Sequence, residues 1–425
     1  MDYRAKMRGC LAKVIACESV ESESLPSAPF GAGVRAALDC MLGEGKSLGF
    51  KTVDYDGYAG EIVLGEGERS VGILCHLDVV PAGDGWNYPP FKLTENGGRL
   101  YGRGVVDDKG AACACLYAMA KIRDEGYKLN SAVRLILGCD EESGWKCMEH
   151  FKEVAPLPSC AFSPDADFPV IYAEKGILHI KLEFKANDRL KYFSCGERVN
   201  MVPSKCVFKA KADSERARAK GIEEKEGVFS CSGVSAHGST PQKGVNAMQP
   251  AIAFLCDEGI LEKEVYGCLF GERYNLTCLA DETGNLTFSP NLAVIENKGV
   301  LSVYVDIRFP ATLEKEEVLN ALKKGGAVFS VEHYSAPLFK DKNSELVSIL
   351  SDVYEEVTGK RCAPVAIGGG TYARAMDNAV AFGPEMPGEV STAHSADENM
   401  STEDFYKLFD IYYLAIKRLS GAKKL

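Results

Sequence analysis

Residues 71–79 read VGILCHLDV, an apolar stretch that includes a histidine and an aspartate two positions apart. A short apolar run of this kind is typical of a strand that is buried on both faces of a parallel sheet. Residues 132–142, AVRLILGCDEE, show the same pattern of an apolar run, here followed by acidic residues. Because helix-like segments alternate with such runs up to about residue 175, we expect an α/β fold with a mixed, mostly parallel sheet flanked by helices.

The pattern of the sequence changes after residue 175. Alternating stretches such as ILHIKLEFKA (177–186) and GVLSVYVDIRF (299–309) predict a separate α+β domain at about 176–335. The α/β pattern then returns and ends with a helix from about Thr402. We therefore predict one discontinuous α/β domain, residues 1–175 and 336–425, with the α+β domain inserted at an exposed loop.

Length and composition limit the classes of function. The 425 residues suit two domains, and no apolar run is long enough to cross a membrane. A net charge of −11 without a long Lys/Arg run argues against a nucleic-acid partner. The N-terminus is charged throughout, which indicates an amphipathic helix rather than a secretory signal. The sixteen cysteines form no C-x-x-C pair, so we expect reduced, buried thiols in the cytoplasm.

His76 and Asp78 stand at the end of the first apolar run. Residues two apart in a strand point to the same face, so Asp78 can orient the ring of His76. A metal-bound imidazole commonly donates its other N–H to such a partner. For this pair alone, the alternative is a structural histidine whose hydrogen bonds are satisfied.

A glycine-rich turn leads into Asp107 and Asp108 at the start of an apolar-faced helix. An aspartate at this place can simply cap the helix and interact favourably with its dipole. Its position beside the strand ends of an open α/β sheet is, however, where such folds place their ligand sites. Asp107 is therefore a candidate ligand as well as a candidate cap.

Three further acidic positions and a histidine follow strand-like runs. Glu141 and Glu142 are adjacent, and such a pair can take separate roles, one binding a metal and one accepting a proton from water. The alternative is a solvated acidic loop. Asp165 follows a short apolar run, and His394 lies in a loop after NAVAFG (378–383).

Together these residues indicate a metal site more strongly than any of them does alone, because the ends of neighbouring strands converge at one edge of a sheet. Two histidines and three carboxylates suit a pair of divalent ions about 3.5–4 Å apart, with one carboxylate between them. Zinc is the expected metal, with manganese or cobalt as alternatives. The candidate ligands are His76, Asp107, Glu142, Asp165 and His394.

Seven phrases of the sequence form a set that spans nearly the whole chain. They are CHLDVVPAGDGW (75–86), YGRGVVDDKG (101–110), DEESG (140–144), SPDADFP (163–169), SAHGSTPQKGVNA (235–247), IGGGTYARAM (367–376) and PGEVSTAHSADE (387–398). Through these phrases the chain resembles the M20 metallopeptidase family. The GGGTYAR phrase is similar to that of the branch of cytosolic dipeptidases that includes PepV.

The resemblance implies how the candidate ligands divide. One metal takes His76 and Asp165, the other takes Glu142 and His394, and Asp107 bridges the two. Glu141 is then the general base, and Asp78 supports the first histidine. The discontinuous α/β domain becomes the catalytic domain, and the inserted domain becomes a lid.

In the lid, the resemblance implies that His237 stabilises the transition-state oxygen. Asn200 and Arg308 look like the residues that hold the substrate, and an arginine suits bidentate capture of a carboxylate. Gly369, Gly370 and Thr371 belong to a glycine stretch that lacks the phosphate-loop pattern. The small glycines would let backbone N–H groups approach a substrate carboxylate.

The expected activity is hydrolysis of a dipeptide or another small peptide by water, with two metals and a glutamate base. An M20-type amidohydrolase that removes N-acyl groups from amino acids is the alternative that keeps the same site. A catalytically inactive metal-binding homologue is the other. The protein could be a monomer or a homodimer, and His237 could act on its own active site or on a partner's.

Overall fold

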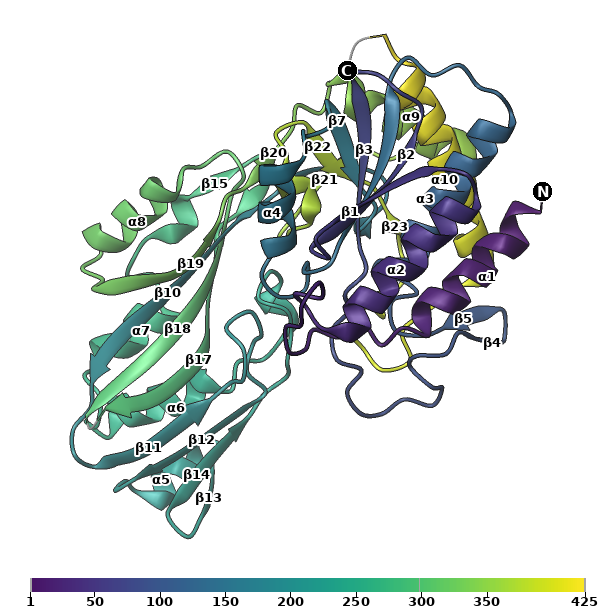
Figure 1. Ribbon diagram of the computed structural model, residues 1–425. Coiled ribbons are helices and arrows are strands. Elements are labelled where there is room, and N and C mark those ends of the chain that lie inside the picture. Colours follow the sequence, from purple (N-terminus) through teal and green to yellow (C-terminus); the bar gives the residue numbers. More distant parts are fainter. Residues whose placement is uncertain (1, 298, 424–425) are drawn as a thin grey trace. The chain divides into compact units, whose positions relative to one another are not determined.

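The structure is a computed structural model that describes residues 2–297 and 299–423 (Figure 1). It divides into two compact units. Of the described residues, the first comprises 2–172, 340–365 and 370–423, and the second comprises 173–297, 299–339 and 366–369. The short segment 366–369 groups with the second unit although it lies far along the chain from the rest of it.

The first unit is built on a mixed sheet whose centre is parallel. Its central strands lie in the order β6 (Ala132–Gly138), β3 (Ser70–His76), β7 (Cys160–Ser163) and β22 (Ala379–Ala381), and all of these neighbours pair in parallel. Every residue of these four strands is buried, as expected at the centre of a parallel sheet. Their carboxyl ends therefore share one edge.

Antiparallel strands extend the sheet on both sides of this centre. Strand β2 (Ala59–Leu64) pairs with β6, and β1 (Lys51–Tyr55) pairs with β2. On the other side, Ile171 of β9 (Ile171–Glu174) pairs with β22. The last residues of β9, Ala173 and Glu174, group with the second unit and pair with β20 (Leu338–Phe339), and β21 (Val365–Ile367) also pairs with β9. The predicted α/β fold with a mixed sheet is confirmed, and its four central strands pair in parallel.

Helix α3 (Lys109–Asp124) fixes the position of the residues just before it. The helix is rich in alanine and cysteine, and all its residues from Lys109 to Ala120 are buried. These small side chains let it pack against β3, α1 and α10. The other helices of this unit are α1 (Tyr3–Ile15), α2 (Ala32–Ser47), α4 (Lys146–Val154), α9 (Glu345–Thr358), α10 (Thr402–Gly421) and the 3-10 turn η3 (Tyr372–Ala375).

Two small sheets bring loops of the first unit together. Strand β24 (Asn399–Ser401) pairs with β5 (Arg99–Tyr101), which pairs with β4 (Thr94–Asn96). Strand β23 (Pro384–Glu385) pairs with β8 (Ala166–Asp167). The first of these sheets places the segment after His394 beside the segment before Asp107.

The second unit is an α+β domain on an antiparallel sheet, as predicted for the inserted domain. The sheet order is β13 (Glu223–Lys225), β14 (Val228–Ser232), β12 (Lys205–Ala210), β11 (Leu190–Cys195), β17 (Thr287–Asn297), β18 (Val300–Phe309), β10 (Gly176–Lys185) and β19 (Phe329–Ser335). Its core includes Leu178, Phe208, Phe254 and Val305. The remaining elements are α5 (Ser214–Ala219), α6 (Met248–Asp257), α7 (Glu264–Phe270), α8 (Lys315–Lys324), η1 (Pro241–Lys243), η2 (Leu276–Cys278) and the hairpin of β15 (Ala280–Asp281) and β16 (Gly284–Asn285).

Candidate metal centre

The central strands of the first unit position four of the predicted site residues. His76 is the last residue of β3, and the segment with Glu141 and Glu142 begins just after β6. Asp165 comes two residues after β7. Because these strands are parallel neighbours, the residues after them gather at one edge of the sheet.

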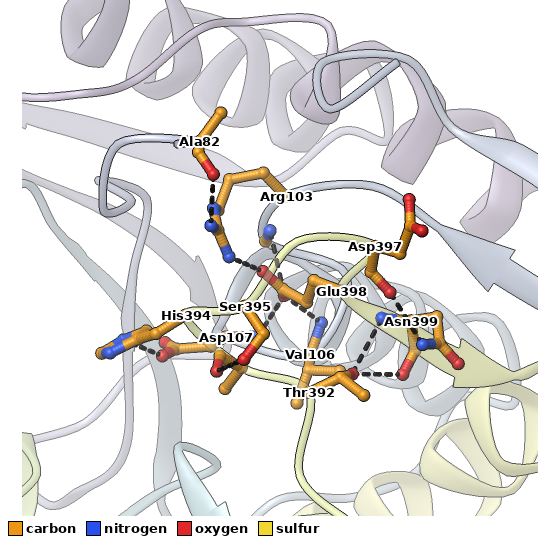
Figure 2. Close-up of polar contacts among 12 residues, drawn as sticks. Ala82, Arg103, Val106, Asp107, Thr392, His394, Ser395, Asp397, Glu398 and Asn399 are labelled. Atoms are coloured by element: carbon orange, nitrogen blue, oxygen red, sulfur yellow. Dashed lines mark hydrogen bonds and ion pairs between the residues drawn. The ribbon is translucent and has the colours of Figure 1, made fainter. Parts of the chain in front are cut away.

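Asp107 lies between two histidines and contacts each through a different oxygen. Its Oδ1 is 2.7 Å from Nε2 of His76, and its Oδ2 is 2.9 Å from Nε2 of His394. Figure 2 shows Asp107 and His394 facing each other across this contact. Nε2 of His394 is also 3.1 Å from Oε1 of Glu142. The carboxylate of Asp107 therefore links the two histidines.

The other acidic residues complete two overlapping groups of donors. One group holds His76, Asp107 and Glu142, and the other holds His76, Glu141 and Asp165. Within each group the donor atoms all lie within 4.8 Å of one another. Asp165 Oδ1 is 3.7 Å from Nε2 of His76. The predicted ligands and the predicted base thus lie in one cluster.

The charges of this cluster are not balanced by its own side chains. Burial and the neighbouring Asp107 carboxylate raise the pKa of Asp165 to about 7. Burial and Asp165 raise the pKa of Glu141 well above its usual value. Desolvation acts to lower the pKa of His394, but its contacts with Asp107 and Glu142 raise it to about 11. The carboxylates repel one another and attract positive charge.

A divalent cation fits this donor set. Bound among the carboxylates, it would relieve their mutual repulsion and replace the protons that the histidines share with them. Two buried oxygens near the cluster, Oδ1 of Asp78 and Oδ1 of Asp108, have no hydrogen-bond partner among the described residues. Histidine nitrogen with carboxylate oxygen is a donor set suited to zinc and related ions.

Asp78 supports the cluster in two ways. Nδ1 of His76 lies 2.9 Å from the backbone carbonyl oxygen of Asp78 and 3.5 Å from its Oδ1. The other carboxylate oxygen accepts a hydrogen bond from the backbone N–H of Glu142 at 3.0 Å. Asp108 is the N-cap residue of α3, but its side chain accepts a hydrogen bond from the backbone N–H of His76.

The second unit brings together another set of predicted residues. The loop of His237 is held by the backbone, because Gly238 N–H donates to the carbonyl of Asn200 at 2.7 Å. Nδ1 of His237 accepts from the backbone N–H of Ser239, which indicates a proton on Nε2. Arg308 is buried in β18, and its NH1 donates to the carbonyl of Gly368 at 3.0 Å.

The predicted glycine stretch lies where the chain passes between the units. Gly369 belongs to the second unit, whereas Gly370 and Thr371 belong to the first. Thr371 is the N-cap of η3, and its hydroxyl accepts a hydrogen bond from the backbone N–H of Ala373. Its hydroxyl therefore already has a structural role.

Sequence reasoning missed three buried residues beside these sites. Glu398 and Arg103 form an ion pair at 2.7 Å in the first unit. Asp306 holds Arg308 in the second unit, through contacts of 2.7 Å to Nε and 2.9 Å to NH2. One available signal was the spacing of Asp306 and Arg308, two apart in a strand and therefore on one face.

Comparison with known proteins identifies the family. The model of peptidase family M20/M25/M40 matches residues 72–418. The chain is 35% identical over 435 residues to "Putative dipeptidase YtjP" of Bacillus subtilis, with 94% of each chain covered. It is 31% identical over 458 residues to "Putative dipeptidase SH1171" of Staphylococcus haemolyticus, with 98% of each covered. The chain belongs to peptidase family M20/M25/M40 and is a metallopeptidase.

Solved structures agree with this fold. The dipeptidase Dug1p from Saccharomyces cerevisiae gives a TM-score of 0.63 at 15% identity, covering 99% of this chain and 97% of that one. The aminoacylhistidine dipeptidase from Vibrio alginolyticus gives 0.61 at 13% identity, with 99% and 97% covered. The predicted M20 membership is confirmed, while the narrower PepV-like branch stays a prediction. None of the described helices is long and apolar enough to cross a membrane.

Proposed function

We propose that this metallopeptidase is a dipeptidase that works with two divalent ions, zinc or alternatively manganese or cobalt. The observation that carries the proposal is Asp107, whose two oxygens contact His76 and His394 separately. A carboxylate in this position suits a bridge between two ions. His76 and Asp165 would hold one ion, and Glu142 and His394 would hold the other.

Glu141 is the proposed general base. It shares one donor group with His76 and Asp165, and it is not engaged by His394 as Glu142 is. Bound ions would acidify a water molecule and polarise the scissile carbonyl. Glu141 would accept the proton of that water and pass it to the leaving amine. Asp78 would hold the ring of His76 in place.

The second unit is the proposed lid and would bind the rest of the substrate. His237 would donate through Nε2 to the oxygen that becomes negative in the transition state, an interaction commonly worth about 2.7–4 kcal/mol. Among the residues that the structure describes, Asp306 and Gly368 engage three of the five N–H groups of Arg308, and the other two would bind a substrate carboxylate. Asn200, Gly369, Gly370 and Thr371 would complete the contacts.

The choice of a dipeptide rests on the relatives. The two described above carry the name dipeptidase and are matched over nearly their full length. The names of these relatives favour a dipeptide over an N-acyl amino acid, and the presence of every proposed ligand and of Glu141 in the sequence argues against an inactive homologue. All sixteen cysteines are free thiols, which supports a cytoplasmic location.

The test is a substrate panel on chelator-treated protein. Dipeptides and N-acetyl amino acids are incubated with zinc, manganese or cobalt added back, and release of free amino acid is measured. Metal-dependent cleavage of dipeptides alone is expected. Cleavage of the N-acetyl compounds alone would replace the proposal by the amidohydrolase alternative, and no hydrolysis with any metal would refute it. Sedimentation of the same sample would show whether the enzyme is a monomer or a homodimer.

A further inference from the structure

Glu398 is a fully buried carboxylate beside the candidate metal centre that has not been given a role so far. Its Oε2 accepts from NH1 of Arg103 at 2.7 Å. Its Oε1 accepts from three backbone N–H groups, those of Gly104 at 3.0 Å, Val106 at 2.9 Å and Asp107 at 3.2 Å. Figure 2 shows Glu398 at the middle of these contacts. One side chain thus fixes the backbone on which Asp107 stands.

Arg103 connects the same carboxylate to a third segment. Its NH2 group lies 3.3 Å from the carbonyl oxygens of Pro81 and Ala82, in the loop that follows His76 and Asp78. Its guanidinium lies over the ring of Trp86, 5.2 Å from the ring centroid. Arg103 is 1% exposed and Glu398 is 0% exposed, so the pair is shielded from water.

We propose that Glu398 and Arg103 are positioning residues that set the distance between Asp107 and the two histidines. Glu398 lies four residues after His394 in the same loop, and it accepts hydrogen bonds from the backbone of the loop that holds Asp107. Arg103 holds the loop that follows His76. Three of the segments that carry proposed ligands, those of His76, Asp107 and His394, therefore meet at one ion pair, which would control how tightly the metal site binds.

The geometry explains why a carboxylate is needed here. Three N–H groups that converge on one oxygen form a site for negative charge, and Arg103 balances that charge inside the protein. A neutral amide at this position would place an N–H donor against Arg103 or against the loop N–H groups. It would also leave the arginine buried without a counter-charge, which is strongly unfavourable. The loop of Asp107 would then shift.

The inference rests on the proposed function, and metal binding tests it directly. Glu398→Gln should weaken the binding of zinc or cobalt, measured by calorimetry on chelator-treated protein, by about 10- to 100-fold. The value of kcat should fall with it, whereas KM at saturating metal should change little. Wild-type protein that bound no metal would refute the proposed function. Wild-type binding with an unchanged Glu398→Gln affinity would refute the positioning role alone.

A matched control separates positioning from folding. Glu61 and Arg134 form another buried ion pair in the same unit, between β2 and β6. Glu61→Gln should lower thermal stability but leave metal affinity unchanged. Equal loss of metal affinity in both variants would overturn the proposal. If Glu398→Gln does not fold, Glu398→Asp keeps the charge but is too short to hold both the loop and Arg103, and it too must weaken metal binding.

Discussion

Histidines lie beside carboxylates in both units, yet their titration is opposite. In the first unit, the pKa of His394 is raised to about 11 by Asp107 and Glu142, against the effect of burial. In the second unit, burial lowers the pKa of His179 to about 4, although its Nε2 lies 3.7 Å from Oδ1 of Asp306. A histidine beside a carboxylate therefore has a raised pKa in the first unit and a lowered pKa in the second.

The difference comes from whether a positively charged side chain already pairs with the carboxylate. Asp306 is already paired with the buried guanidinium of Arg308, so little attraction remains for a second cation. In the first unit, several carboxylates face two histidines and no arginine or lysine contacts them among the described residues. The first region is therefore built to receive positive charge, and the second is balanced by its own residues.

The largest effect is expected from removing the carboxylate between the two histidines. Asp107→Asn should abolish tight binding of the second ion and lower kcat/KM by more than about 10³-fold, because metal activation supplies several kcal/mol. Metal content after gel filtration and the rate of dipeptide cleavage are the measurements. Asp124→Asn, at the exposed other end of α3, is the control and should behave as wild type. Normal metal content in Asp107→Asn would contradict the bridging role.

The next largest effect distinguishes the roles of two adjacent residues of the first region, Glu141 and Glu142. Glu141→Gln should lower kcat by about 10²- to 10⁴-fold with metal content retained, because it removes only the proton acceptor. Glu142→Gln should lose metal together with activity. The comparison needs only metal analysis and steady-state kinetics of the two variants. Loss of metal in Glu141→Gln with retention in Glu142→Gln would exchange their roles.

The sequence predicted the first region better than the second because the strands position it. His76, Glu141 and Asp165 follow apolar runs, and a parallel sheet places the ends of its strands together. Their gathering could therefore be expected, although their separate roles remain predictions. The fold class followed from the same alternation of strands and helices.

The residues that were missed act through contacts between distant parts of the chain. Glu398 holds the backbone of residues 104–107, which lie about 290 positions earlier, and no local pattern reports such a contact. The grouping of 366–369 with the second unit was hidden for the same reason. Asp306 differs, because its spacing from Arg308 made a shared face visible in the sequence.

A smaller effect is expected from the arginine of the second region. Arg308→Lys should raise KM for dipeptides by about 10- to 100-fold, because hydrogen bonds to a charged group contribute roughly 1.5–3 kcal/mol. Metal affinity should not change. The control is a dipeptide whose C-terminal carboxylate is replaced by an amide. If the variant loses activity equally on both substrates, Arg308 does not recognise that carboxylate.

The smallest effect on catalysis is expected from Asp306, and it tests whether the two regions are independent. Asp306→Asn leaves Arg308 buried without its counter-charge, so unfolding should become easier by up to about 3–5 kcal/mol. The value of kcat/KM should fall only about tenfold, through the orientation of Arg308, because a charge-assisted contact is weakened rather than removed. Thermal unfolding, kinetics and metal titration of this variant are compared with those of Glu398→Gln. Because Asp306 is balanced within its own unit, its loss should leave metal affinity unchanged, whereas the loss of Glu398 should weaken it. Equal weakening in both variants would show that the second region also shapes the metal centre.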